Sequence, residues 1–324
     1  MRQAVDARDF ARVACARVNT SHNKEMPRNR RAPEWERRTR APVPLPPPKS
    51  CDCQFHIFGD PEKYPLRFDV TYQPPKATFA DMRNVLRTIG FERGVIVHTQ
   101  RYDIDHSLLI DELEALNPQE RKNFRAIGIV RDELSDRELE RLHAVGVRGA
   151  RFHLGKRWGQ VHEPEAVRRS MMRVRELGWH ARLHISGSDV ADWGDFLRSV
   201  KGVTMVIDHM GHLDFSLGLE QPAMRWILDC LREENWWLKL SNGNRDSVME
   251  TGWDDAIPFG KAFIAAAPDR MIWGTDWPHT GWRKQRMMND AETVELLYRY
   301  VDNDPELVRR ILADNPARLH GFDD

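Results

Sequence analysis

The chain has 324 residues, and its 49 Lys and Arg residues are balanced by 49 Asp and Glu residues. A chain without net charge has no broad field that attracts nucleic acid or an anionic membrane, so we expect neither as a partner. The four cysteines, Cys15, Cys51, Cys53 and Cys230, are too few and too irregularly spaced for a disulfide scaffold or a structural zinc site.

The N-terminal part of the chain differs in composition from the rest. Residues 1–47 are rich in Arg, Pro and Asn, lack a sustained apolar period and lead into Pro46-Pro47-Pro48, so we predict a disordered extension. An organelle transit peptide is an alternative that the scattered acids argue against, and a start at Met26 is another. No run approaches the roughly 20 apolar residues of a membrane span, and no secretory signal is present, which predicts a cytoplasmic protein.

From Ser50 onward, short β-rich runs alternate with longer amphipathic segments, and we assign 48–324 to one domain. Two of the amphipathic segments begin with capping boxes, Thr78 with Asp81 and Ser135 with Glu138. The runs predict strands over 53–58, 94–98, 125–130, 147–154, 181–185, 204–208, 236–240 and 271–274. Eight alternations in roughly 250 residues predict an α/β fold, a TIM (β/α)₈ barrel, in preference to a doubly wound sheet.

Active sites of such barrels lie at the C-terminal ends of the strands, and several of these ends are polar. The polar residues there are Gln54 and His56 on one face of the first strand, His184 in the fifth, His209 after the sixth and Asp276 after the eighth. Each could merely satisfy a loop backbone, and for His279, which follows a proline, we expect that structural role. The coincidence across strands predicts a catalytic centre that includes His56, His209 and Asp276.

Arginines form a second group at the same end of the predicted barrel. Arg151 lies inside the apolar fourth strand, Arg157 lies in the loop after it, and Arg245 follows the seventh strand. A guanidinium buried without a partner is costly, and a carboxylate ligand would be a suitable partner. The alternative is a protein carboxylate such as Asp208 or Asp276, and Arg157 could also be solvent-exposed.

These motifs, in this order, resemble the amidohydrolase superfamily, and within it the 2-pyrone-4,6-dicarboxylate hydrolase-like group. The resemblance runs from about Pro48 to Phe322. It includes Asp52-Cys-Gln-Phe-His56, Arg151-Phe-His-Leu-Gly-Lys-Arg157, Asp208-His-Met-Gly211, Trp273-Gly-Thr-Asp-Trp-Pro278 and Asp314-Asn-Pro-Ala-Arg318.

The resemblance implies roles for the polar residues at the strand ends. Asp276 is expected to be the base that activates water, and His56 and His209 are expected to polarise the carbonyl group of a lactone. The residues expected to bind the substrate and its carboxylates are Arg151, Arg157, Arg245, Tyr72, Gln54 and His184. It also implies catalysis without a metal or other cofactor.

The first strand departs from the His-x-His pattern of the superfamily, because Gln54 replaces the first histidine. A neutral amide is a poor ligand for a transition metal, so we expect no tightly held zinc. His56, His184, His209 and Asp276 leave a weaker site for one divalent metal as an alternative. His184 is a second departure, since the hydrolase has a tyrosine there, and this leaves the choice of lactone open.

The sequence therefore predicts a hydrolase that opens a carboxylated lactone, with a small acidic lactone as its partner. Attack by a substrate hydroxyl in place of water would make it a lactone isomerase on the same site, and the sequence does not separate the two. A metal-dependent hydrolase or decarboxylase and a barrel that binds a ligand without chemistry are further alternatives. Burial would raise the pKa of Asp276 and nearby arginines would lower it, and the sequence does not determine which of these two effects is larger.

Overall fold

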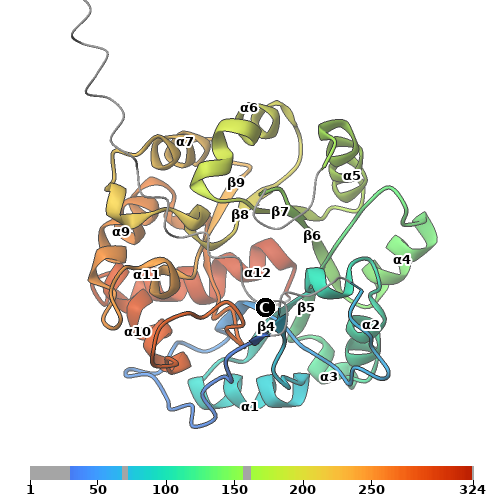
Figure 1. Ribbon diagram of the computed structural model, residues 1–324, viewed down its shortest axis with the longest axis horizontal. Helices are drawn as coiled ribbons and strands as arrows, with labels where there is room; N and C mark the ends of the chain where they lie inside the picture. The colour runs from blue at the N-terminus through green and yellow to red at the C-terminus, as the bar shows by residue number, and fades with distance from the viewer. Residues whose placement is uncertain (1–29, 68–71, 156–161, 323–324) are drawn as a thin grey trace, which may run out of the picture.

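The structure, a computed structural model, describes residues 30–67, 72–155 and 162–322. Eight parallel strands neighbour one another in chain order and form a ring (Figure 1). They are β2 (Cys51–Phe55), β4 (Arg93–Val97), β5 (Phe124–Gly128), β6 (Val147–His153), β7 (His180–His184), β8 (Met205–Ile207), β9 (Trp236–Leu240) and β10 (Met271–Trp273). The chain after β10 bonds to β2, with Asp276 N donating to Gln54 O at 2.9 Å and His56 N to Trp277 O at 2.8 Å. The predicted barrel is confirmed.

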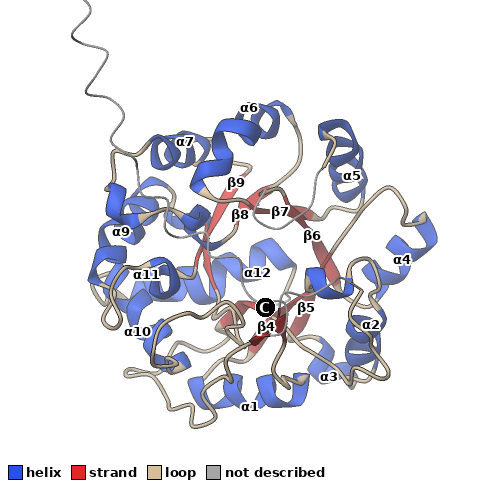
Figure 2. Ribbon diagram, viewed as in Figure 1, coloured by secondary structure: helices blue, strands red, loops and turns tan. Residues whose placement is uncertain are grey.

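Helices follow the strands; most lie outside the ring, and α12 lies across its middle in this view (Figure 2). They are α1 (Phe79–Ile89), α2 (Ser107–Glu114), α3 (Pro118–Arg121), α4 (Asp136–Ala144), α5 (Pro164–Glu176), α6 (Val190–Ser199), α7 (Pro222–Cys230), α8 (Gly243–Asp246), α9 (Ile257–Ala266), α10 (Asp290–Tyr300), α11 (Pro305–Arg309) and α12 (Asn315–His320). Both predicted capping boxes are present, at Thr78 before α1 and Ser135 before α4. A side chain there satisfies the free amides of the first turn, so each helix begins where expected.

The first strand ends earlier than the sequence pattern predicts. It spans Cys51–Phe55 and contains a register shift between Asp52 and Phe55. Phe55 pairs with Ile96 of β4 and also forms a parallel bridge with Trp277, just beyond β10. His56 therefore lies just beyond the strand, at the seam where the barrel closes.

Residues 1–29 of the predicted extension lie outside the described residues, but residues 32–45, which we call the N-terminal strap, contact the barrel. Trp35 packs edge-on against Trp277, with ring centroids 5.0 Å apart. Arg40 forms an ion pair with Glu295 of α10 at 2.5 Å. Ordered contacts thus begin before the predicted domain start at residue 48.

The two ends of the barrel are covered differently. At the amino ends of the strands, Arg125 donates to Gly321 O at 2.7 Å, and the segment after α12 packs there through Phe322. The opposite end is formed by the loops that follow the strands. In the described ranges, no helix is both long and apolar enough to cross a membrane.

Candidate active site

Asp276 lies in a sharp turn directly after β10, with a left-handed backbone (φ 63°). Its side chain is buried and accepts from Asn242 Nδ2 at 3.0 Å and from Gln54 Nε2 at 3.2 Å. Burial opposes ionisation of Asp276, but its pKa is lowered, and the neighbour that carries a permanent positive charge is Arg245. The structure thus supports the lowering effect of neighbours, and the carboxylate is ionised at neutral pH.

Two imidazoles point their Nε2 atoms at this carboxylate. His56 Nε2 lies 3.4 Å from Asp276 Oδ1, and His209 Nε2 lies 3.7 Å from the same oxygen. His56 Nδ1 donates to the Val97 carbonyl at 2.7 Å, and His209 Nδ1 is 2.8 Å from Ser241 Oγ. Burial lowers the pKa of His209, so this ring is neutral. The three residues predicted to be catalytic do lie together.

Arg151 pairs with a protein carboxylate, the alternative considered for it. Its Nε lies 3.0 Å from Asp208 Oδ2, and its NH2 group donates to His209 Nε2 at 3.1 Å. Arg245 has a side chain that is 32% exposed, and its NH1 lies 3.5 Å from Asp276 Oδ2. It is therefore better placed than Arg151 to meet a ligand. Arg157 lies outside the described residues, as does the side chain of Tyr72.

Below the carboxylate of Asp276 lies a buried layer of charge that the sequence analysis missed. Lys239 Nζ donates to Asp208 Oδ1 at 2.7 Å, and Arg182 NH1 donates to Gln54 Oε1 at 3.0 Å. Burial alone would raise the pKa of Asp208, but Lys239, Arg151 and Arg182 hold it far below its usual value. The available signal was the one used for Arg151, namely a charged residue inside an otherwise apolar strand.

His184 belongs to a group of imidazoles on the other side of His209. Residues 209–212 form a left-handed turn, and its three-residue spacing places the rings of His209 and His212 with centroids 4.9 Å apart. His184 Nε2 lies 3.2 Å from His212 Nε2, and His212 Nδ1 donates to Asp246 Oδ2 at 2.8 Å. His212 and Asp246 were missed, although the spacing of His212 from His209 was a usable signal.

Of the described residues, His184, His209 and His212 form the group whose nitrogen atoms lie close enough to share a metal ion, within 4.8 Å. This group shares His184 and His209 with the set predicted from sequence, and has His212 in place of His56 and Asp276. Because Arg151 already donates to His209 Nε2, a cation there would have to displace a guanidinium.

His279 has a structural contact of the kind expected for it. Its Nε2 lies 2.8 Å from Asp290 Oδ1 at the start of α10, and both side chains are buried. Thr39 of the N-terminal strap donates to the other oxygen of Asp290 at 3.3 Å. The turn that carries Asp276 is thus tied to α10 and to the strap.

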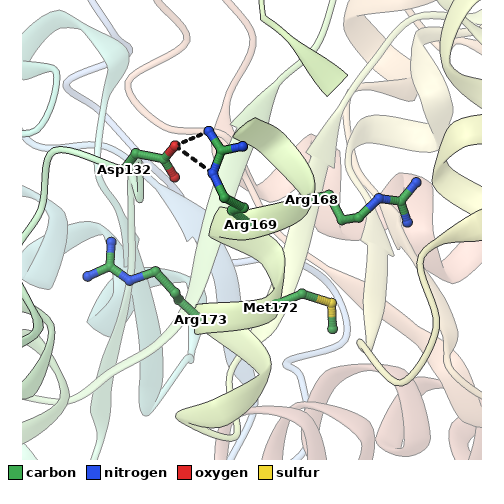
Figure 3. A pocket seen from close by; sticks show the side chains of 5 residues that line it. All are labelled: Asp132, Arg168, Arg169, Met172 and Arg173. Atoms are coloured by element: carbon green, nitrogen blue, oxygen red, sulfur yellow. Dashed lines mark hydrogen bonds and ion pairs between the residues drawn. The ribbon is translucent and has the colours of Figure 1, made fainter. Parts of the chain in front are cut away.

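A separate pocket lies along α5, away from these residues. Figure 3 shows the side chains that line it, with Asp132 paired to a guanidinium, and they are Asp132, Arg168, Arg169, Met172 and Arg173. Asp132 pairs with Arg169 at 2.5 Å, and Arg173 pairs with Asp136 at 2.8 Å. These arginines are neutralised by the protein, and none of the predicted site residues lines the pocket.

The chain is similar to several known proteins along most of its length. A family model described as amidohydrolase matches residues 51–322. The 4-sulfomuconolactone hydrolase of Hydrogenophaga intermedia is 32% identical over 85% of this chain and 89% of its own length. The 2-pyrone-4,6-dicarboxylate hydrolase of Comamonas testosteroni is 30% identical over 85% of this chain and 90% of its own. A solved apo structure from Agrobacterium tumefaciens superposes with a TM-score of 0.76 at 23% identity, covering 87% of this chain and 99% of that one.

Proposed function

Because the chain belongs to the amidohydrolase family, we propose that it hydrolyses a lactone that carries an acidic substituent, using Asp276 to deprotonate the attacking water. The observation that carries this proposal is an ionised carboxylate at the strand ends, 3.4 and 3.7 Å from two imidazole nitrogens. The names of the relatives, both lactone hydrolases, support the same reaction.

In the proposed reaction, the water oxygen bonds to the lactone carbonyl carbon while Asp276 takes its proton. The developing oxyanion is stabilised by the Arg151 guanidinium beside His209, whose NH2 group has a second N–H besides the one that it donates to His209 Nε2. The ring C–O bond then breaks, and the leaving oxygen receives the proton held by Asp276. The products are a hydroxyl or enol group and a carboxylic acid, which releases the second proton of the water to solvent and becomes a carboxylate.

Arg245 is the residue proposed to hold the acidic substituent. Its guanidinium lies beside Asp276 and is partly exposed, so a carboxylate or sulfonate can reach it. His184 would line the remaining space, as the resemblance implies, whereas Gln54, which the resemblance also implies, is fully buried and has no surface for a substrate. A charge-assisted contact there orients the ring over the base, and orientation contributes much of the rate in such reactions.

We further propose that the reaction needs no metal and that it serves the breakdown of aromatic or sugar acids in the cytoplasm. Cys51, Cys53 and Cys230 are unpaired thiols in the described part of the chain, which is compatible with a reducing compartment. No step above requires a Lewis acid, because the base is ionised and the donors are already in place.

The test incubates chelator-treated protein with 4-sulfomuconolactone, 2-pyrone-4,6-dicarboxylate and sugar-acid lactones in ¹⁸O-labelled water. Mass spectrometry and NMR then follow the products. Hydrolysis incorporates one labelled oxygen into the new carboxylate, whereas isomerisation changes the ring without label. Absence of turnover with every acidic lactone contradicts the proposed function, and turnover only after zinc is added contradicts the metal-free part.

A further inference from the structure

The side-chain amide of Gln54 is fully buried, and four side chains bond to it. Its Oε1 accepts from Arg182 NH1 at 3.0 Å and from Lys239 Nζ. Its Nε2 lies 3.2 Å from Asp276 Oδ1 and 3.2 Å from His56 Nε2. One end of the amide thus faces two cations, and the other end faces two proton acceptors.

The chemistry of these neighbours allows one orientation of the amide. If it were reversed, its NH₂ group would face Arg182 and Lys239, which offer N–H donors, and its oxygen would face the carboxylate of Asp276. Both ends would then be buried against groups of their own kind, which folded proteins avoid. Burial lowers the pKa of Lys239 to about 7, and the nitrogen carries N–H donors in either form.

This orientation determines what His56 presents to the centre. The carbonyl of Val97 only accepts, so His56 Nδ1 carries a hydrogen and donates to it at 2.7 Å. In the neutral ring, Nε2 then has its lone pair free to accept from Gln54. His56 and Asp276 are therefore held side by side as proton acceptors, which is the form that a general-base reaction needs.

The same orientation makes this place unsuitable for a metal. A cation between His56 Nε2 and Asp276 Oδ1 needs a lone pair from Gln54, but the amide directs N–H groups at it. Lys239 and Arg182 lie behind the amide, and both are fully buried. Gln54 and His56, the polar residues at the end of the first strand, thus do not fit the metal ion that the wider family implies.

We propose that Lys239 and Arg182 are positioning residues: through Gln54 they hold His56 and Asp276 as a pair of proton acceptors and keep metal ions out of the space between them. The catalytic part of this inference rests on the proposed function. The part that concerns metal exclusion and the His56 tautomer does not, so each can be tested separately.

The metal arm compares Gln54 with Gln54→Glu and Gln54→Met in full-length protein that also carries His212→Asn, which breaks the three-imidazole group. Glutamate keeps an oxygen for Lys239 and Arg182 but turns the other end into an acceptor. After one equivalent of Zn²⁺ and gel filtration, we expect about one zinc per chain for Gln54→Glu and near none for the other two. Stoichiometric zinc in the parent that is lost with His56→Asn, or no zinc in Gln54→Glu, overturns the proposal.

The tautomer arm uses ¹⁵N-histidine NMR, with His56→Asn to assign the signal. The parent should show His56 with Nδ1 protonated and Nε2 unprotonated. Lys239→Met, which acts at the far end of the amide, should move the Nε2 shift in the same direction as Gln54→Met does, whereas Lys239→Arg should restore it. If the Lys239→Met variant folds and its His56 Nε2 shift is unchanged, Lys239 has only a structural role.

The kinetic arm applies to any lactone that the parent turns over. Gln54→Met and Lys239→Met should lower kcat about tenfold or more and leave KM within about twofold of the parent value. The two proton acceptors, His56 and Asp276, would be misaligned, whereas Arg245 would be untouched. A change confined to KM overturns the positioning role. If the parent turns over no lactone, the proposed function fails, while the metal and tautomer arms still decide this inference.

Discussion

Asp208 and Asp276 are both buried carboxylates inside the barrel, and neighbouring charge keeps the pKa of both below the usual value. Asp208 has no exposed surface and is paired with Lys239 and Arg151, which are themselves almost fully buried. Asp276 is 7% exposed, and its hydrogen bonds come from the neutral amides of Asn242 and Gln54. Among the described Lys and Arg side chains, Arg245 is the one paired with it, and Arg245 is partly exposed.

This difference separates a carboxylate that neutralises charge from one that can react. Taking a proton on Asp208 would leave buried cations without their counter-charge, which is costly. Asp276 can take a proton because its amide partners carry no charge and its cationic partner reaches solvent. The buried layer around Asp208 therefore fixes the structure, and the residues around Asp276 provide the chemistry.

The largest expected effect is that of Asp276→Asn on turnover. The amide has nearly the same shape but cannot act as a base, so kcat should fall by about 10³-fold or more. The melting temperature should change little, because the buried ion pairs of Asp208 are untouched. Steady-state kinetics and thermal unfolding of the same preparation check this, and near-normal turnover would remove Asp276 from the reaction.

Asp208→Asn should have the opposite profile, with loss of stability as its main effect. Lys239 and Arg151 would lose a buried counter-charge, so the free energy of unfolding should fall by about 3–5 kcal/mol. Urea unfolding measures this. Wild-type stability in this variant would show that the buried layer does not depend on its carboxylate.

Arg245→Met should chiefly weaken substrate binding. Loss of one partly exposed, charge-assisted contact should raise KM for acidic lactones about tenfold, with a smaller effect on kcat. Arg286→Met is the matched control, since Arg286 forms an exposed pair with Glu292 of α10 at 2.9 Å. Equal KM values for the two variants would argue against substrate contact by Arg245.

The smallest effect concerns pH. Burial lowers the pKa of His180 in the barrel interior and of His209 beside Asp276, so the folded protein holds both rings neutral. The unfolded chain binds their protons below about pH 6.5, so stability is complete above that pH and is lost as pH falls below it. Between pH 7.5 and 6 the loss should be about 0.8 kcal/mol per ring.

Urea unfolding at several pH values tests this linkage. The His180→Asn variant should show a smaller slope of unfolding free energy against pH, by the contribution of one ring. A slope of the opposite sign would mean that these rings are charged in the folded protein. Turnover should not fall over the same range through protonation of Asp276, because its pKa is lowered.

The sequence predicted the barrel because apolar strand runs and helix caps are local signals, and Thr78 and Ser135 cap as expected. It also brought His56, His209 and Asp276 together, since strand ends meet at one mouth. Lys239 and Arg182 were missed although each is a charged residue inside a barrel strand, β9 and β7, the signal that singled out Arg151. His212 follows His209 by three residues, which was a usable signal, but the left-handed turn that brings the two rings together has no local pattern of its own.

The backbone conformation of the site also limits which sequences can diversify it. His209, His212, Asn242 and Asp276 all have positive φ, at 53°, 43°, 62° and 63°. Gly, Asn and Asp tolerate this region best, whereas β-branched residues are strongly disfavoured there. A library for directed evolution should therefore leave Val, Ile and Thr out of these four positions. New activity is better sought at Arg245, which is not among the residues with positive φ.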